Sequence, residues 1–523
     1  MSPRWVWSDT RLWYPPLLAQ GVRVSRCTDL RLCELIVRRS ALTSESVVAR
    51  RPTEAWLSES RMDDAGADTA ALFVLDAETV DHPVALDEFH LQHDAVSTST
   101  HPGPLGLLLA AESAGALIAA EMRFAGVPFD EERHRCLLED VLGERDPFGR
   151  PRMLTELAQD IQGILHVPDL NVDSPGDMLR ALNRVGVLVS STRAWQLREV
   201  DHPVISPLLR YKKLSRLMTA NGWNWLETWV SEGRFHPEYV PGGVVTGRWA
   251  AHGGGALQLP KQVRAAVVAD PGWKLVVADA AQLEPRILSG LARDESMARA
   301  GFGRDLYSGI VASGIIDTRA HAKVAMLGAM YGATTGDAGR LMPRLSRAFP
   351  RAIDVVERAA RTGEGGGVVT SRLGRSSPPP PSAWWSTQSA ASAPDVSEST
   401  QRHARRQARE WGRFTRNFVV QATAAEWALC WMAQVRTHLN ALAPQRAWQK
   451  GAHLVYFLHD EIIVHTPAAD AEAVAHIITQ SAHDAGRLLF GDFPVEFPVS
   501  VSIVDNYAQA QKPHENDDVD FDE

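Results

Sequence analysis

Two acidic side chains stand at positions where a carboxylate could do chemistry. Asp279 ends the apolar run KLVVADA, and Asp460 lies in YFLHDEIIVH, between two apolar stretches. An acid at the end of a buried strand is costly unless it meets a cation, a hydrogen-bond donor or a cleft. The competing interpretations are a helix N-cap for Asp279 and an ordinary turn acid for Asp460.

A third segment supplies positive charge. Arg319, Lys323, Leu327 and Tyr331 recur every four residues, so a helix would place them on one face. Two cations and an aromatic ring on one stripe can hold a triphosphate and stack beside a base. Taken singly, each cation fits a solvated basic turn and the tyrosine fits a core position. Combined with two carboxylates that can hold two divalent metals, the stripe indicates a nucleotidyl-transfer site.

The elements that must position these residues follow from the hydrophobic pattern. Expected strands lie at 273–280, at 454–466 as two strands joined by a tight turn, and at 497–504. Expected helices lie at 105–127, 281–300, from about 319, from about 401 and at 471–489. Helical signals continue to about 231, with a break near 171–175 where Asp173 or Ser174 could cap the next helix.

Two segments have the composition of loops. The stretch 41–68 is rich in Ser, Arg, Asp and Ala, which predicts a loop or flexible insertion. The stretch 376–400 is rich in Pro and Ser and is expected to be a loop or disordered. The second stretch would separate the helix that begins near 319 from the helix that begins near 401.

Composition narrows the class of protein. The chain has 523 residues, of which 45% are hydrophobic and 22% charged, as in a globular protein of several domains. It contains neither an apolar run of membrane-spanning length nor a signal-peptide core, so we expect no membrane contact and a cytoplasmic location. Four sparse cysteines fit a reducing compartment.

Charge is unevenly distributed along the chain. The net charge is -9, and the segment 515–523 carries six acids, which predicts a solvated tail. The segment 402–416 instead carries six arginines and one glutamate. An acidic chain with one basic stretch is compatible with a DNA-binding groove without requiring one.

On these motifs the chain resembles the family A DNA polymerases, the bacterial DNA polymerase I type. VVADAAQLEPRIL resembles their motif A, RAHAKVAMLGAMYG their motif B and LHDEIIV their motif C, in the family's order. Further likeness lies in YKKLSRL, TGRW, LQLP, RFTRNFVVQATAAEW and FPVSVSIVDNYAQA. The resemblance covers about 105–510. It implies a multi-domain α/β protein with a right-hand polymerase fold, in which an antiparallel-sheet palm is joined by helical fingers and a helical thumb.

The resemblance also implies roles for single residues. Asp279 and Asp460 would bind two Mg²⁺ ions, which Mn²⁺ can replace, and Glu461 would support them. The other residues implied to act on the nucleotide are Arg319, Lys323 (also catalytic), Leu327, Tyr331, Glu284 and Gln282. Tyr331 would stack near the templating position. Those implied to contact primer–template DNA are Arg248, Gln258, Arg413, Asn417, Gln421 and His459.

Two of these implied roles bear on selectivity. Glu284 occupies the steric-gate position, which implies a preference for dNTPs over ribonucleotides. The DNA contacts would fall on minor-groove acceptors that all base pairs share, so they would check the shape of the duplex and not its sequence.

The chain departs from the family pattern at several positions. Motif A has Ala280 and Ala281 where Tyr and Ser are usual, and motif B has Leu327 in place of an aromatic ring and Met326 in place of Asn. Loss of the ring would remove stacking on the incoming nucleotide. The metal-binding acids and the phosphate-binding cations are retained, which favours an active enzyme.

The N-terminal part resembles a shortened 3′–5′ exonuclease domain. The segment 5–37 resembles the region of its second motif, with Asp29 near the usual acid. Asp76 and Glu78 imitate a first motif but follow the second, so a strand ending in an acidic turn is the favoured interpretation. His90 and His93 are expected on an exposed helix and not at a metal. We therefore expect no proofreading activity and no 5′-nuclease domain.

The expected organisation has four parts. They are an exonuclease-like region at 1–104, a thumb at 105–234, a palm with fingers at 235–510 and an acidic tail at 511–523. The expected function is extension of a DNA primer with dNTPs and release of pyrophosphate, in replication or repair, with protein partners unspecified. Alternatives are a retired polymerase-like DNA-binding protein, a bifunctional exonuclease–polymerase, and a single-subunit RNA polymerase, which Glu284 disfavours.

Overall fold

The protein is represented by a computed structural model, which describes residues 3–52, 82–147, 149–255, 259–333, 336–394 and 396–510. Its chain divides into two compact units, each assembled from separate stretches of sequence. Unit 1 comprises Met1–Ala125, Tyr239–Ala251 and Val276–Ile503. Unit 2 comprises Gly126–Glu238, His252–Leu275 and Val504–Glu523. Contacts between segments distant in sequence therefore hold each unit together.

Unit 1 contains a four-stranded sheet with the strand order β11-β8-β10-β9. Its strands are β8 (Trp273–Ala280), β9 (His453–Leu458), β10 (Glu461–Pro467) and β11 (Val499–Val504). Strands β9 and β10 form an antiparallel hairpin, in which Glu461 pairs with Leu458. The strands predicted from the apolar runs are confirmed. In β8 four consecutive residues are buried, which explains why its sequence is apolar without alternation.

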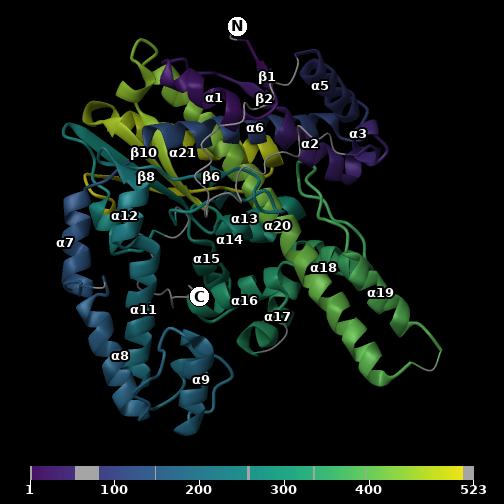
Figure 1. The fold of residues 1–523 in the computed structure, drawn as a ribbon. Coiled ribbons are helices and arrows are strands. Elements are labelled where there is room, and N and C mark those ends of the chain that lie inside the picture. The colour runs from purple at the N-terminus through teal and green to yellow at the C-terminus, as the bar shows by residue number, and fades with distance from the viewer. Residues whose placement is uncertain are drawn as a thin grey trace. The chain divides into compact units, whose positions relative to one another are not determined.

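One long helix organises the other elements of unit 1. Helix α20 (Glu398–Leu442) packs against α18, α21 and α6 (Figure 1). Trp427 and Trp431 on α20 are fully buried, and an added Cβ at Gly115 of α6 would lie 2.7 Å from Leu429. Glycine at that position therefore allows the two helices to approach closely.

The remaining helices of unit 1 are shorter. They are α1 (Thr10–Ala19), α2 (Leu30–Arg39), α3 (Val47–Arg50), α5 (His82–Ser97), α6 (Pro102–Ala125), α13 (Leu283–Ala292), α14 (Glu295–Gly301), α15 (Leu306–Ala312), α16 (Arg319–Tyr331), α17 (Gly336–Ala348), α18 (Pro350–Glu364), α19 (Ser382–Ala391) and α21 (Ala471–Phe490). Among the described helices, α6 alone has the length and apolar composition of a possible membrane span. Its most apolar window is 67% buried inside the protein, and core helices pass the same test.

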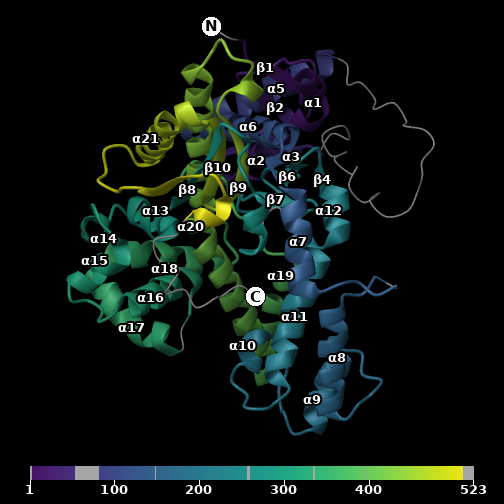
Figure 2. The ribbon, with the colours of Figure 1, turned by 90° about the vertical axis from the view of Figure 1, so that its left-hand side faces the viewer.

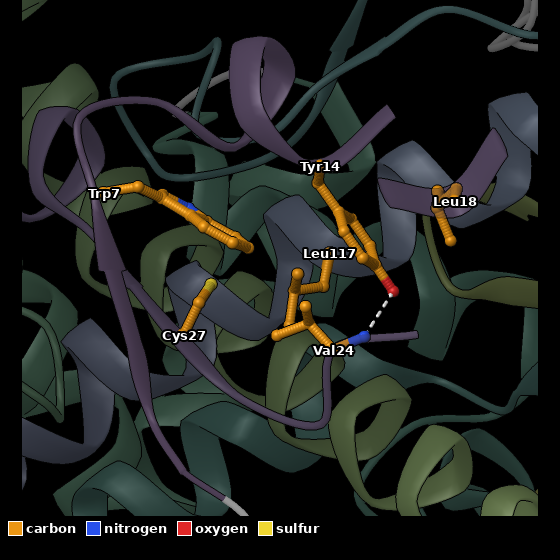
Figure 3. Packing of buried hydrophobic residues seen from close by; sticks show 6 residues of the cluster. All are labelled: Trp7, Tyr14, Leu18, Val24, Cys27 and Leu117. Atoms are coloured by element: carbon orange, nitrogen blue, oxygen red, sulfur yellow. Dashed lines mark hydrogen bonds between the residues drawn. The ribbon is translucent and has the colours of Figure 1, made fainter. Parts of the chain in front are cut away.

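The N-terminal segment packs onto α6. Strands β1 (Trp5–Trp7) and β2 (Cys27–Asp29) pair in parallel, and side chains from this segment enclose Leu117 of α6 (Figure 3). The hydroxyl of Tyr14 accepts a hydrogen bond from the backbone N–H of Val24 at 3.2 Å and donates to Glu121 at 2.6 Å. Glu121 also pairs with Arg436 of α20 at 2.6 Å, so apolar packing and a buried ion pair both anchor the segment.

Unit 2 combines a helical part with a small sheet. Helices α8 and α11 lie side by side (Figure 2), and strands β3 and β4 flank β5. The bounds are α7 (Glu131–Leu142), α8 (Arg152–Leu165), α9 (Pro175–Arg184), α10 (Ala194–Leu197), α11 (Ile205–Asn221), α12 (Trp223–Trp229), β3 (Val127–Pro128), β4 (Val230–Ser231) and β5 (Arg234–Phe235). Ser174 caps α9 by accepting a hydrogen bond from Asp177 N–H, as one of the two predicted caps.

Several sequence expectations are corrected. The stretch 376–400, expected to be a loop or disordered, contains helix α19 and the start of α20. The expected helix at 281–300 is two helices, α13 and α14, because Asp294 begins a new helix by capping Met297 N–H. Within the expected loop at 41–68, the described part includes α3 and a 3-10 turn at Ala41–Thr43.

A buried acid ties α20 to the loop before α19. Glu426 accepts hydrogen bonds from Leu373 N–H at 2.9 Å and from the hydroxyl of Ser371. Burial raises the pKa of Glu426 to about 7, although both hydrogen bonds oppose that shift. The folded state therefore holds the Glu426 proton more tightly than the unfolded chain does.

This linkage predicts that stability falls as pH rises from the ordinary pKa of 4.5 through about 7. The free energy of unfolding of the wild type should drop by up to about 3 kcal/mol over that range relative to Glu426→Gln, which cannot titrate. Urea denaturation of both proteins between pH 5 and 8 measures this difference. Parallel curves for the two proteins would contradict the assignment.

Candidate active site

The sheet of unit 1 brings the two predicted acids together. Strands β8 and β10 are neighbours, and Ala280 N–H donates a hydrogen bond to the carbonyl of Asp460 at 3.0 Å. Asp279 precedes Ala280 in β8, and both aspartates are half-buried. Neighbouring strands lie ~5 Å apart, so two acidic residues separated by 181 positions in the sequence lie close together at one end of the two inner strands.

Asp279 lies in a strand and Asp460 in a turn between two strands, and neither acid is the N-cap of a helix. The residue that caps α13 is Gln282, so the interpretation of Asp279 as a helix N-cap is wrong. Asp460 lies with His459 in the two-residue turn between β9 and β10, where His459 has a left-handed φ of +57°. His459 is exposed, whereas Glu461 begins β10 and is buried. The three consecutive residues therefore meet different environments.

A buried arginine fixes the backbone that follows β8. The guanidinium of Arg286 donates to the carbonyls of Ala281, Gly301 and Arg304 at 3.2, 3.0 and 2.8 Å. Gln282, at a left-handed φ of +49°, uses its amide to donate to Asp305 at 2.9 Å. Burial lowers the pKa of Arg286, and its hydrogen bonds compensate the buried charge. The start of α13 is thus fixed by Gln282, which was predicted to act on the nucleotide, and by Arg286, which was not predicted as a site residue.

Four predicted site residues form one hydrogen-bonded chain. Glu284 on α13 pairs with Arg248, and the hydroxyl of Tyr331 on α16 donates to Glu284 at 3.0 Å. Gln421 on α20 donates to the hydroxyl of Tyr331 at 3.4 Å. Burial and the charge of Glu284 raise the pKa of Tyr331, which keeps the phenol protonated as a donor. Residues predicted to contact the sugar, the templating base and the DNA therefore meet around one carboxylate.

The predicted phosphate-binding cations lie on α16. Arg319 forms an ion pair with Asp305 at 3.1 Å and lies over the ring of Tyr307. Burial alone would raise the pKa of Asp305, but the hydrogen bond and charge of Arg319 bring it below its ordinary value. Lys323 and Leu327 follow on the same helix and are half-buried. An incoming phosphate would have to compete with Asp305 for Arg319.

The remaining predicted DNA contacts lie on α20, with one exception. Arg413 is exposed and packs beside Gly332, the left-handed C-cap of α16. The side-chain oxygen of Asn417 is buried and has no hydrogen-bond partner within the described structure. Gln258 lies outside the described residues.

A buried ion pair supports the turn that carries Arg248. Arg375 pairs with Glu112 of α6 at 2.7 Å, and both side chains are largely buried. Gly247, with φ +83°, lies against the guanidinium of Arg375, where an added Cβ would come within 2.5 Å of Nε. Burial raises the pKa of Glu112, and the charge of Arg375 opposes the shift. The guanidinium of Arg375 thus packs against Gly247, the residue that precedes Arg248.

The acids and histidines weighed for other sites have different outcomes. Asp29 is fully buried and accepts hydrogen bonds from Leu32 N–H and Thr10 N–H at 2.9 and 2.8 Å, which is a structural capping role. His90 and His93 are exposed on α5, as expected. Asp76 and Glu78 lie outside the described residues. The described ranges contain no cluster of three or more metal-ligating side chains.

Comparisons with known proteins agree with this architecture. The family model described as DNA polymerase family A matches residues 151–509. The chain belongs to DNA polymerase family A, which confirms the resemblance drawn from the motifs. It is similar to the thermostable DNA polymerase I of Thermus filiformis, with 26% identity over 331 residues, and to that of Thermus thermophilus, with 28% identity over 345 residues. It also resembles DNA polymerase I of Chloroflexus aurantiacus, with 25% identity over 366 residues.

The matched regions cover 57%, 59% and 65% of this chain, respectively, but only 36% of each relative. The chain thus spans about a third of the length of the relatives it matches. A solved structure of the POL domain of Pol1 from M. smegmatis, in complex with DNA primer-template and dNTP, has a TM-score of 0.67 at 18% identity. That match covers 94% of this chain and 84% of the other. It shows a shared fold and confirms the predicted α/β polymerase class.

Three supporting residues were not predicted from the sequence. Asp305 pairs with Arg319, and Arg286 donates a hydrogen bond to Gln282. Arg375 packs against Gly247, beside the predicted site residue Arg248. Asp305 had a recognisable local signal, since it caps α15 by accepting from Ser308 N–H at 2.7 Å. The spacing in the sequence gave no sign that its second partner would be Arg319.

The contact between Gly247 and Arg375 can be tested by adding one methyl group. Gly247→Ala should destabilise the protein by about 1–3 kcal/mol beyond the cost of the left-handed backbone alone, because Cβ would displace the guanidinium. The matched control is Gly21→Ala, at φ +76° with no atom within 4 Å of the added Cβ. Equal losses of unfolding free energy in urea for both variants would show that the close contact with Arg375 does not affect stability.

Proposed function

We propose that this chain extends the 3′ end of a primed DNA strand with dNTPs, directed by a template, and releases pyrophosphate. The observation that carries the proposal is the pairing of β8 with β10, where Ala280 N–H meets the carbonyl of Asp460. In a chain that belongs to DNA polymerase family A, this pairing supports the assignment of Asp279 and Asp460 to one metal site. The likeness to a polymerase domain solved with primer-template and dNTP supports the same substrates.

The donor set fits divalent cations of the Mg²⁺ type. Mg²⁺ is commonly bound by one or two carboxylates and completes its shell with water and substrate phosphates. Asp279 and Asp460 supply two half-buried acids at one end of the inner strands β8 and β10. When bound, two such ions would activate the primer hydroxyl and neutralise the leaving pyrophosphate. We assign the metal-binding role to Asp279 and Asp460, with Mn²⁺ as a possible substitute.

The other site residues would orient the substrate. Lys323 and Arg319 on α16 would neutralise the triphosphate, with Arg319 exchanging its ion pair to Asp305 for phosphate oxygens. Glu284, held by Arg248 and Tyr331, presents a fixed carboxylate that would exclude a 2′-hydroxyl from the sugar site. The hydrogen-bonded chain to Gln421 would connect the sugar site with the template side.

Removal of one acid tests the reaction. Asp460→Asn should reduce primer extension with Mg²⁺ and dNTPs at least ~1000-fold, because a lost metal ligand removes several kcal/mol of transition-state stabilisation. Asp492→Asn makes the same charge change at a 98% exposed side chain and should leave extension unchanged. Gel-resolved extension of a labelled primer measures both variants.

The outcome also separates polymerase from binding protein. If the wild type binds primer–template but extends it with neither Mg²⁺ nor Mn²⁺, the chain is a retired DNA-binding relative and the proposed activity fails. If Asp460→Asn retains wild-type extension, the metal assignment is wrong.

Sugar selection has its own test at Glu284. Glu284→Ala should raise ribonucleotide use relative to dNTP use by about 10- to 100-fold, since the excluding carboxylate is lost. Glu295→Ala, which removes a 66% exposed carboxylate, is the control. The ratio of kcat/KM for rNTP and dNTP incorporation gives the effect, and an unchanged ratio would refute the gate assignment.

A further inference from the structure

The N-terminal part of α20 carries a concentrated positive charge, of which the proposed function uses only Arg413. Between positions 402 and 416 there are six arginines and one glutamate, in a chain whose net charge is -9. Four of these arginines and a histidine are exposed on α20 and are here termed the arginine face: Arg402, His403, Arg405, Arg406 and Arg409. With Ser399 they line an open hollow of about 510 Å³.

Acidic groups of the protein scarcely neutralise this charge. Arg402 lies 3.7 Å from Glu398, and both side chains are highly exposed, so that ion pair is weak. Arg406 lies against His403 at 3.0 Å, a contact that brings no negative charge. Within the described parts of the chain, Arg405 and Arg409 form no ion pair with a carboxylate. Repulsion among these cations is unfavourable unless an anion is present.

The opposite side of the same helix is covered. Gln388 of α19 donates to the carbonyl of Ala404 at 3.0 Å, and Ala404 is buried. Trp384 of α19 is also buried, at 6% exposure. In Figure 1, α19 lies beside this part of α20, which extends away from the four-stranded sheet. Helix α19, formed by the Pro- and Ser-rich stretch, thus supports α20 from the side that faces away from the arginines.

The arginine face is continuous with the candidate active site. Positions 402, 406, 409, 413, 417 and 421 are three or four residues apart, so they form one stripe along α20. The stripe ends at Gln421, which contacts Tyr331 and through it Glu284. At ~1.5 Å per residue, Arg409 lies ~18 Å and Arg402 ~29 Å along the helix from Gln421.

Cations that follow one another along a single helix suit a single phosphate backbone. Arginine pairs well with phosphate oxygens, and proteins bind unpaired strands through positively charged tracks that do not read sequence. The stripe belongs to a single helix, and the hollow that the arginines line is open. Since the stripe starts beside Tyr331, a strand that follows it would leave the site at the templating position.

We propose that the arginine face binds the phosphate backbone of the unpaired template strand ahead of the templating base. The inference rests on the proposed polymerase function and adds a surface for a part of the substrate that the catalytic residues do not reach. Template held along α20 would be kept extended as it approaches the site. The contact is electrostatic, so its strength falls as salt rises.

The test compares two lengths of template overhang. The variant combines Arg402→Gln, Arg406→Gln and Arg409→Gln, because glutamine keeps helix propensity and removes charge. The control combines Arg299→Gln, Arg340→Gln and Arg487→Gln, whose side chains are similarly exposed at 69%, 68% and 64%. Fluorescence anisotropy measures binding of one labelled duplex with a template overhang of either one or about twelve nucleotides, over a range of salt.

We expect the variant to bind the long-overhang substrate about tenfold more weakly than the wild type does. The plot of the logarithm of the association constant against the logarithm of salt concentration should be less steep by about 2, as for three lost phosphate contacts on a single strand. Binding of the short-overhang substrate should match that of the control. Equal loss on both substrates would assign the arginine face to the duplex, and no loss on either would show a solvated surface; each result overturns the proposal.

A parallel measurement separates this inference from the proposed function. Primer extension by the wild type is followed on the same duplex with an overhang of one nucleotide, which does not reach the arginine face. If the wild type extends the primer but the arginine variant binds both substrates as tightly as the control does, only the inference about the arginine face is refuted. Absence of both extension and binding would refute the polymerase function on which it rests.

Discussion

The hydrogen bond between Ala280 N–H and the carbonyl of Asp460 is the contact on which the candidate active site depends. It registers β8 against β10, which brings the backbone at Asp279 close to that at Asp460, the two acids proposed to bind metal. Two half-buried acids repel each other and lose hydration, so the arrangement needs a rigid sheet behind it. The buried faces of β8, β9 and β10 provide that sheet, and α20 and α21 belong to the same packed unit.

Ion pairs between distant segments form a second level of organisation. Arg248 with Glu284, Arg319 with Asp305, and Arg375 with Glu112 each join two elements of unit 1. Buried pairs of this kind contribute little net stability, because desolvation offsets much of their attraction. Their value here is geometric, since each holds a long arginine side chain in one position against an acid of another segment.

The N-terminal segment has taken up a structural role in the described residues. Asp29 caps α2 and also accepts from Thr10 N–H, and Glu121 of α6 binds both Arg23 and Arg436. Burial would raise the pKa of Glu121, but the two arginines bring it far below its ordinary value. Asp29 thus stabilises the segment internally, whereas Glu121 joins the segment to α6 and α20.

Local sequence determined the strands β8, β9 and β10, the helices α6 and α21, and the identity of the two acids at strand ends. These features follow from apolar runs and helical periodicity, which act over a few residues. The tertiary structure alone decided that 382–391 is a helix, because burial of Trp384 beside α20 overrides the composition of the stretch. It also decided the partners of Arg248, Arg319 and Arg375, which lie 36, 14 and 263 positions away in sequence. A side chain's charge can be read from sequence, but its partner depends on which elements pack together.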